Sequence, residues 1–111
     1  MRRSIGLTLI ILALGSAPAL ASPVSTAQVH VSVRGTAGVI YVSAKSGRHA
    51  GCLIDCTYTY ATGTRISIRA QPAANVTHFV RWSGACTGKA RTCTLTLRKN
   101  VRVTATFALG G

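Results

Sequence analysis

The side chains that could take part in electrostatic or acid–base chemistry are almost all basic. The 111 residues contain 13 lysines and arginines but a single acid, Asp55, which gives a formal net charge of +12 at pH 7. One carboxylate does not supply the pair of acids that most glycoside hydrolases use. It also does not supply the oxygen-rich ligand sets that bind calcium and most magnesium ions. The composition excludes these classes and leaves the cationic side chains as the main functional signal.

The three histidines are the remaining candidates for catalysis or metal binding. His30, His49 and His78 are far apart in the sequence and fall in different predicted elements. A catalytic histidine needs an acid that orients it and a nucleophile that it activates. Asp55 lies inside a predicted disulfide loop, where we expect it to support the turn by bonding a backbone N–H. We therefore predict surface histidines, with no catalytic residue, metal or cofactor, and no enzyme activity.

Four cysteines offer a second kind of chemistry. Three residues separate Cys52 from Cys56, and six separate Cys86 from Cys93. The second gap suits a structural zinc site poorly, so two disulfides are favoured over metal binding. Four cysteines allow three pairings. Local geometry favours Cys52–Cys56 across a tight loop, and Cys86–Cys93 if a chain reversal brings them opposite each other on paired strands.

The first 21 residues have the features of a signal peptide. Two arginines precede an apolar run at 5–14, and small residues then lead to a predicted cleavage after Ala21. The run is shorter than the roughly 20 residues that span a bilayer, so we expect no stable membrane insertion after cleavage. An uncleaved membrane anchor is the alternative. The mature domain is then residues 22–111, and its predicted location is extracellular or periplasmic, where disulfides persist.

The elements that must position these side chains are predicted to be strands. Apolar and polar residues alternate with a period of two in four segments, 29–34, 65–70, 92–97 and 101–107, and more weakly in 39–43 and 57–61. No segment shows convincing helical periodicity, and 72–76 forms one turn at most. The phase of the alternation predicts a common core of Ile66, Ile68, Trp82, Leu95, Leu97, Val101, Val103 and Phe107.

A longer pattern joins the cysteines to these strands. It consists of Cys52, Cys56, Gly63-Thr64, Ala70, Pro72, Phe79, Trp82-Ser83-Gly84, Cys86, Cys93, Val103, Ala105 and Phe107. This pattern resembles the divergent InlB B-repeat family, a small module of bacterial surface and secreted proteins. The resemblance implies a mainly β fold, specifically a small antiparallel, β-grasp-like sheet domain. It also implies a spacer, stalk or binding unit rather than an enzyme.

Three arginines are the candidate binding residues. Arg65, Arg69 and Arg102 occupy the polar phase of their predicted strands, so they form a cationic stripe if those strands are neighbours. Export makes anionic cell-envelope polymers or acidic glycans the accessible partners, and no nucleic-acid-binding motif is present. The predicted function is a secreted, non-catalytic binding or adhesion module. The alternatives are a structural spacer without a ligand, a small secreted inhibitor, or a basic charge that serves solubility alone.

Overall fold

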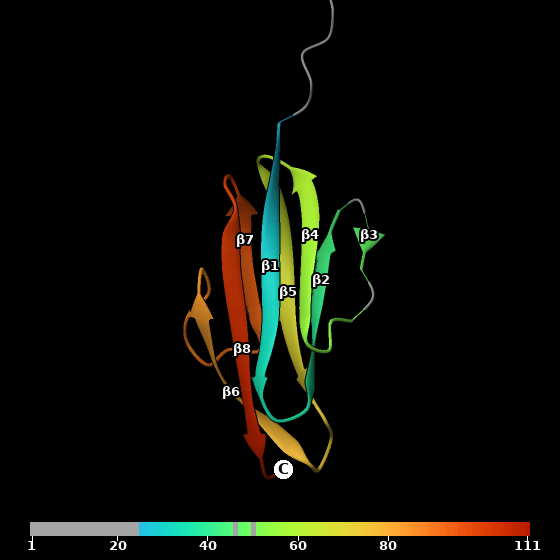
Figure 1. Cartoon of the computed structure of the whole chain (residues 1–111), viewed down its shortest axis with the longest axis vertical. Helices are drawn as coiled ribbons and strands as arrows, with labels where there is room; N and C mark the ends of the chain where they lie inside the picture. The colour runs from blue at the N-terminus through green and yellow to red at the C-terminus, as the bar shows by residue number, and fades with distance from the viewer. Residues whose placement is uncertain (1–24, 46, 50) are drawn as a thin grey trace, which may run out of the picture.

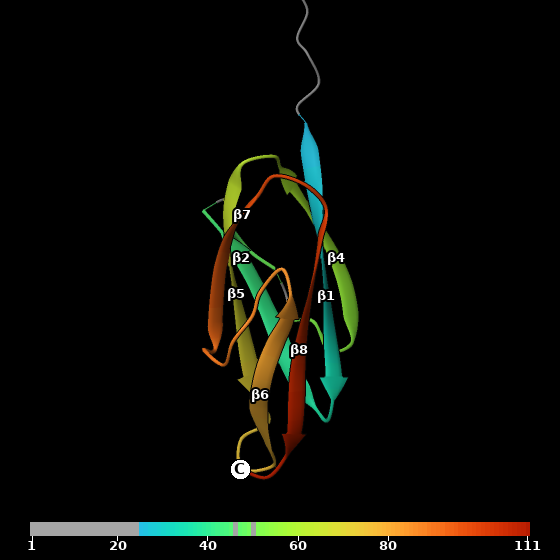
Figure 2. The same cartoon turned by 90° about the vertical axis from the view of Figure 1, so that its left-hand side faces the viewer.

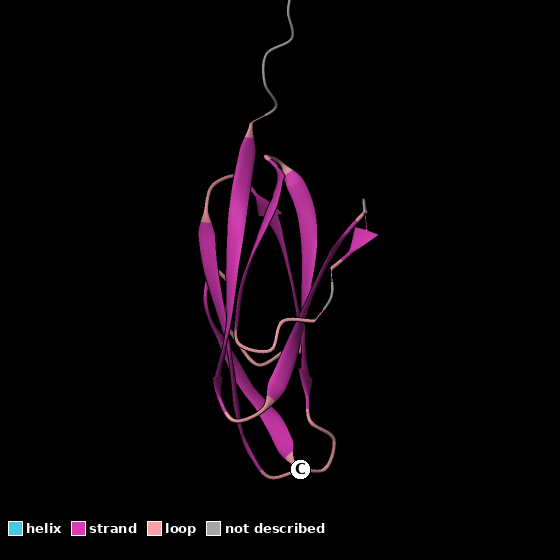
Figure 3. Cartoon of the chain, turned by 45° about the vertical axis from the view of Figure 1, so that its right-hand side comes forward, coloured by secondary structure: helices cyan, strands magenta, loops and turns pink. Residues whose placement is uncertain are grey.

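The computed structural model describes residues 25–45, 47–49 and 51–111, so the predicted signal peptide at 1–21 lies outside the described residues. Within these residues the chain forms eight strands and no helix, and therefore no helix that could cross a membrane (Figures 1 and 3). The strands are β1 (Thr26–Gly35), β2 (Gly38–Ala44), β3 (Gly47–Arg48), β4 (Asp55–Ala61), β5 (Thr64–Pro72), β6 (Thr77–Gly84), β7 (Thr92–Leu97) and β8 (Val101–Leu109).

The strands divide between two facing sheets. The first sheet has the order β4-β1-β8-β6, and the second has the order β3-β2-β5-β7. Figure 2 shows β2, β5 and β7 on one side of the molecule, facing β1 and β4 on the other. All pairs are antiparallel except β1 with β8, which run parallel. The prediction of a mainly β, largely antiparallel domain is confirmed, and its strands are divided between two sheets. Each alternating strand has one apolar face, and two sheets bury those faces against each other.

The core lies between the two sheets and follows the predicted phase. Ile66, Ile68, Leu97, Val103, Phe107 and Trp82 are all buried, at 0–2% exposure. Leu95 and Val101 are only partly buried against this core, because Leu95 lies on the edge strand β7 and Val101 begins β8. Burying one such Val, Leu, Ile or Phe side chain stabilises the fold by about 1.5–3 kcal/mol.

The alternation of apolar and polar residues did not predict strand β6, because this strand contains a β-bulge. Phe79 and Trp82 are three residues apart, so a regular strand would point them to opposite faces. A register shift between Phe79 and Arg81 adds one residue and returns both rings to the core, with their centroids 5.0 Å apart. The Trp82 Nε1–H donates to the Ala90 carbonyl at 2.6 Å, so this aromatic pair belongs to the core and not to a sugar-stacking surface.

Both predicted disulfides are present, and each links the two sheets at one lateral edge. The backbone of Cys52 is hydrogen-bonded to that of Ile40 in β2 of the second sheet, whereas Cys56 belongs to β4 of the first sheet. The Cα atoms of Cys52 and Cys56 are 6.0 Å apart. Cys86 follows β6 of the first sheet and Cys93 lies in β7 of the second, with Cα atoms 6.1 Å apart. The predicted reason for the second pair was wrong, since β6 and β7 are not paired strands.

Candidate functional site

Arg65 and Arg69 lie where the alternation predicted, on the outer face of the second sheet. Both are exposed, and the inward residues between them on β5 are fully buried. At the usual rise of a strand, four residues separate them by about 13 Å. Ser67 lies midway, and its cross-strand partners are Ser43 of β2 and Thr94 of β7. Two guanidinium groups therefore flank a row of three hydroxyl side chains, Ser43, Ser67 and Thr94, which we call the hydroxyl row.

The hydroxyl row is the floor of a shallow groove. One depression of about 650 Å³ includes the hydroxyl row together with Lys45 and Arg65 in its lining. A smaller depression of about 200 Å³ is lined by Tyr41, Ser43, Ser67 and Arg69. The two depressions share Ser43 and Ser67, so they adjoin. We call the combined surface of Tyr41, Lys45, Arg65, Arg69 and the hydroxyl row the arginine groove.

Arg69 is held in place before any ligand arrives. Its guanidinium carbon lies 5.6 Å from the centroid of the Tyr41 ring, within the range of a cation–π contact. Its Nη1 also donates to Gln71 Oε1 at 3.2 Å. Within the described chain, no carboxylate pairs with Arg65 or Arg69. An arginine already ordered by neutral partners loses less conformational entropy when it binds an external anion.

Arg102 does not join the other two arginines, so the predicted three-residue stripe was wrong. It lies on β8 in the first sheet, directly opposite His30 of β1 in the parallel register. Its exposed side chain projects from the opposite side of the sandwich. The alternation correctly gave its outward phase, but phase does not specify which strands share a sheet.

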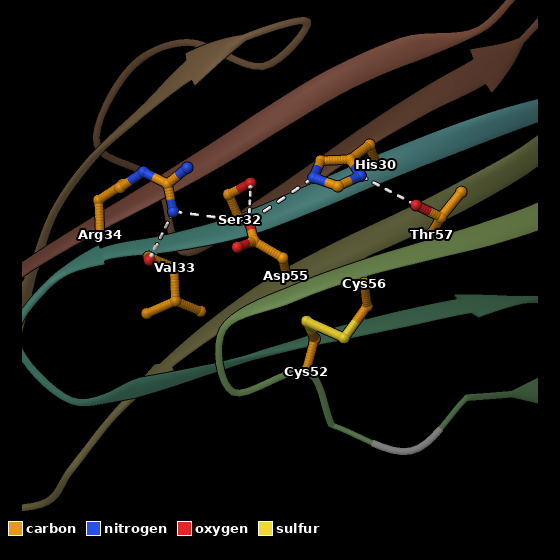
Figure 4. A network of polar contacts seen from close by, with 8 residues as sticks. All are labelled: His30, Ser32, Val33, Arg34, Cys52, Asp55, Cys56 and Thr57. Carbon is orange, nitrogen blue, oxygen red and sulfur yellow. Dashed lines mark hydrogen bonds and ion pairs between the residues drawn. A yellow bond between two sulfur atoms is a disulfide. The ribbon is translucent and has the colours of Figure 1, made fainter.

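The single acid is engaged by side chains of the neighbouring strand β1 (Figure 4). Ser32 Oγ donates to Asp55 Oδ1 at 2.6 Å, and the same oxygen lies 3.5 Å from Arg34 Nη1 and 3.6 Å from His30 Nε2. The expectation that Asp55 bonds the backbone of its own turn was therefore wrong. The hydrogen bond from Ser32 is the largest cause of a lowered pKa for the Asp55 carboxyl; desolvation opposes it, and the charge of Arg34 adds to it.

The side chains around Asp55 include a serine and a histidine, the other two residue types of a catalytic triad. Their hydrogen bonds, however, differ from those of a triad. The Ser32 hydroxyl is buried and bonds to the carboxylate, whereas a nucleophilic serine bonds to the imidazole. Thr57 Oγ1 does lie 2.9 Å from His30 Nδ1. The carboxylate that would orient that ring is, however, 3.6 Å away and shares Oδ1 with Ser32 and Arg34. The cluster ties β4 to β1 and neutralises the one acid.

The Asp55 contacts predict a specific dependence of stability on pH. A carboxyl whose pKa is lowered by folding stabilises the fold above the pKa of the unfolded chain, about 3.8, and that stabilisation is lost as the pH falls through the lower pKa of the folded state. We expect Asp55→Asn to reduce the free energy of unfolding by a constant amount above about pH 5. The difference from the unsubstituted protein should shrink below pH 4 and vanish at lower pH, as measured by urea unfolding at each pH. A difference that persists unchanged at pH 2 would contradict this assignment.

The sequence profile of the divergent InlB B-repeat domain matches residues 38–111. The chain belongs to this family. The matched part begins with β2 and includes both disulfides and the whole arginine groove. In this divergent InlB B-repeat chain, β1 precedes the matched part, yet it pairs with both β4 and β8 inside the first sheet. The strand is thus an integral part of the folded unit.

The comparison with solved structures found a similarity to a bacterial adhesin from Mobiluncus mulieris that contains intramolecular disulfide, isopeptide and ester bond cross-links. The sequence identity is 10% and the TM-score is 0.44, over 77% of this chain and 42% of the adhesin chain. The matched part of this protein therefore spans less than half the length of the adhesin chain. No curated protein matches the sequence.

The sequence analysis missed the residues that join the two arginines into a groove. Ser43, Ser67 and Thr94 lie in the polar phase of their strands, which was a usable signal. Their alignment in one row depends on the registers of β2 and β7 against β5, and these registers are not visible in the alternation. Among the described residues, no group of three His, Cys, Asp or Glu side chains is placed to hold a metal ion.

Proposed function

We propose that this domain is a non-catalytic surface module that binds an anionic polymer, such as an acidic glycan, through the arginine groove. The divergent InlB B-repeat family supports a binding or adhesion role, and the two disulfides support an oxidising location outside the cytoplasm. Residues 22–111 retain 11 of the 13 lysines and arginines against a single acid, and this excess of positive charge supports an anionic partner.

The observation that carries this proposal is that Asp55, the single acidic side chain, makes its contacts within the first sheet. Asp55 is engaged by Ser32 and Arg34 in the first sheet, so it is not available to the arginines of the second. Arg65 and Arg69 must then be solvated or meet an external anion. The serine and threonine hydroxyls between them add donors and acceptors that suit sugar hydroxyls, sulfates or carboxylates.

A groove of this kind favours a polymer over a single small anion. An exposed ion pair contributes about 0.2–1 kcal/mol and is weakened by salt. Two arginines about 13 Å apart reach different charged groups of one extended chain, so their contributions act on the same binding event. The affinity should therefore depend on polymer length and fall as the salt concentration rises.

The test is binding to heparin, used as a sulfated polymer probe, at low and increasing salt. We expect Arg65→Gln combined with Arg69→Gln to weaken binding about 5- to 30-fold at low salt, which corresponds to the loss of about 1–2 kcal/mol. The matched control is Lys89→Gln with Lys99→Gln, which removes the same charge from two exposed loop positions.

The control separates a site from a general charge effect. Specific binding requires the groove variant to elute at lower salt than both the control variant and the unsubstituted protein. Equal weakening in the groove and control variants would mean that net charge alone drives retention. No retention of the unsubstituted protein at low ionic strength would end the polyanion proposal.

A further inference from the structure

The outer face of the first sheet also holds a cavity lined by cationic and polar groups. Its volume is about 490 Å³, and its lining includes Gln28, His30, Thr57, Asn100 and Arg102. We infer that this cavity is part of a second anion-binding site, so that one domain bridges two chains of an anionic polymer. This inference rests on the proposed function of the arginine groove.

The cavity is built from side chains that are already positioned. His30 and Arg102 are direct cross-strand partners, which places their strands about 4.8 Å apart. The backbone N–H of Gln28 donates to Asn100 Oδ1 at 2.8 Å, which orients the Asn100 amide and leaves its NH₂ group as a donor. Thr57 bonds to the His30 ring at 2.9 Å. Arg102 and Asn100 line the same cavity, so both side chains can offer N–H donors to an anion that enters it.

A second unpaired arginine extends this site across the sheet. Arg81 of β6 and Arg34 of β1 are both partners of Thr106 in β8. Arg34 is opposed by Asp55 at 3.5 Å, but within the described residues Arg81 and Arg102 have no carboxylate partner. Four residues along β8 and one strand spacing across give a Cα separation of about 14 Å between Arg81 and Arg102.

The two faces therefore present arginine pairs at nearly the same spacing. About 13 Å separates Arg65 from Arg69 and about 14 Å separates Arg81 from Arg102, so a polymer whose charges suit one face suits the other. The two sheets lie about 10 Å apart with the apolar core between them. Outward side chains of stacked sheets project in opposite directions, so one short, extended ligand reaches one face only. Occupation of both faces joins two ligands through one protein molecule.

The test is a two-layer capture measurement. The protein is first captured on immobilised heparin, and a short, fluorescently labelled heparin oligosaccharide is then added to the washed surface. The unsubstituted protein is expected to retain the labelled oligosaccharide. The control variant Lys89→Gln with Lys99→Gln, which leaves both faces intact, is expected to retain it to a similar extent.

Variants of either face should separate capture from bridging. Arg81→Gln with Arg102→Gln is expected to be captured through the arginine groove but to bind at least fivefold less of the labelled oligosaccharide. Arg65→Gln with Arg69→Gln should lose the second layer in the same way. All four positions are exposed, so the variants are expected to fold, and thermal melting is the measurement that checks this.

The outcomes distinguish this inference from the function on which it rests. Capture of the unsubstituted protein without any second layer would overturn bridging while leaving polymer binding intact. An undiminished second layer in Arg81→Gln with Arg102→Gln would overturn the second site. Absence of the first capture would overturn both proposals.

Discussion

Replacing Gly84 with alanine is expected to lower the free energy of unfolding by about 2–5 kcal/mol. Gly84 ends β6 with a φ of +90°, which an L-residue adopts only at a cost. A Cβ at this position would lie 2.3 Å from the Arg102 carbonyl oxygen. That oxygen belongs to the backbone of β8, so relief of the clash requires β6 and β8 to separate. Urea unfolding of the folded variant measures the loss.

Gly63 provides a matched control for this substitution. Its φ of +94° is nearly the same, but an added Cβ would meet no atom within 4 Å. We therefore expect Gly63→Ala to cost only the conformational strain of a left-handed residue, about 1–2 kcal/mol. Equal losses in the two variants would show that the contact with β8 is not the cause. A larger loss in Gly84→Ala than in Gly63→Ala would show that Gly84 is needed because the β8 backbone lies too close to leave room for a Cβ.

Removing the Cys86–Cys93 disulfide is expected to have the second large effect. The bridge closes a loop of eight residues, for which the chain-entropy model gives about 2.5 kcal/mol of stabilisation. The substitutions Cys86→Ala and Cys93→Ala together should lower the melting temperature by about 10–20 °C for a domain of this size. The bridge joins β6 to β7 across the two sheets, so its loss frees one lateral edge of the sandwich.

The second disulfide serves as the comparison. Cys52→Ala with Cys56→Ala opens a loop of five residues, for which the same model gives about 2 kcal/mol. The two double variants should therefore both melt well below the unsubstituted protein under oxidising conditions. Reduction should lower the melting temperature of the unsubstituted protein more than that of either double variant, because the unsubstituted protein has two bridges to lose. An unchanged melting temperature on reduction would contradict the assigned role of both bridges.

Much of the fold follows from local patterns. Strict alternation in segments such as 65–70 and 101–107 marks both the strand and its buried face, because successive side chains point to opposite sides. The close spacing of Cys52 and Cys56 similarly favoured one local disulfide. The bulge in β6 shows the limit of this approach. One extra residue allows Phe79 and Trp82 to share a face, and it also removes the periodic signal of the strand.

By itself, the sequence determined the strand class, the inward and outward phase of most residues, the local Cys52–Cys56 disulfide and the excess of positive charge. Only the tertiary structure decided which strands share a sheet and in which register. It placed Arg65 and Arg69 beside the hydroxyl row and put Arg102 on the other side of the core. Phase is a local property of one strand, because it follows from the pleat. Partnership between strands depends on contacts between distant segments, and a period of two is compatible with many such pairings.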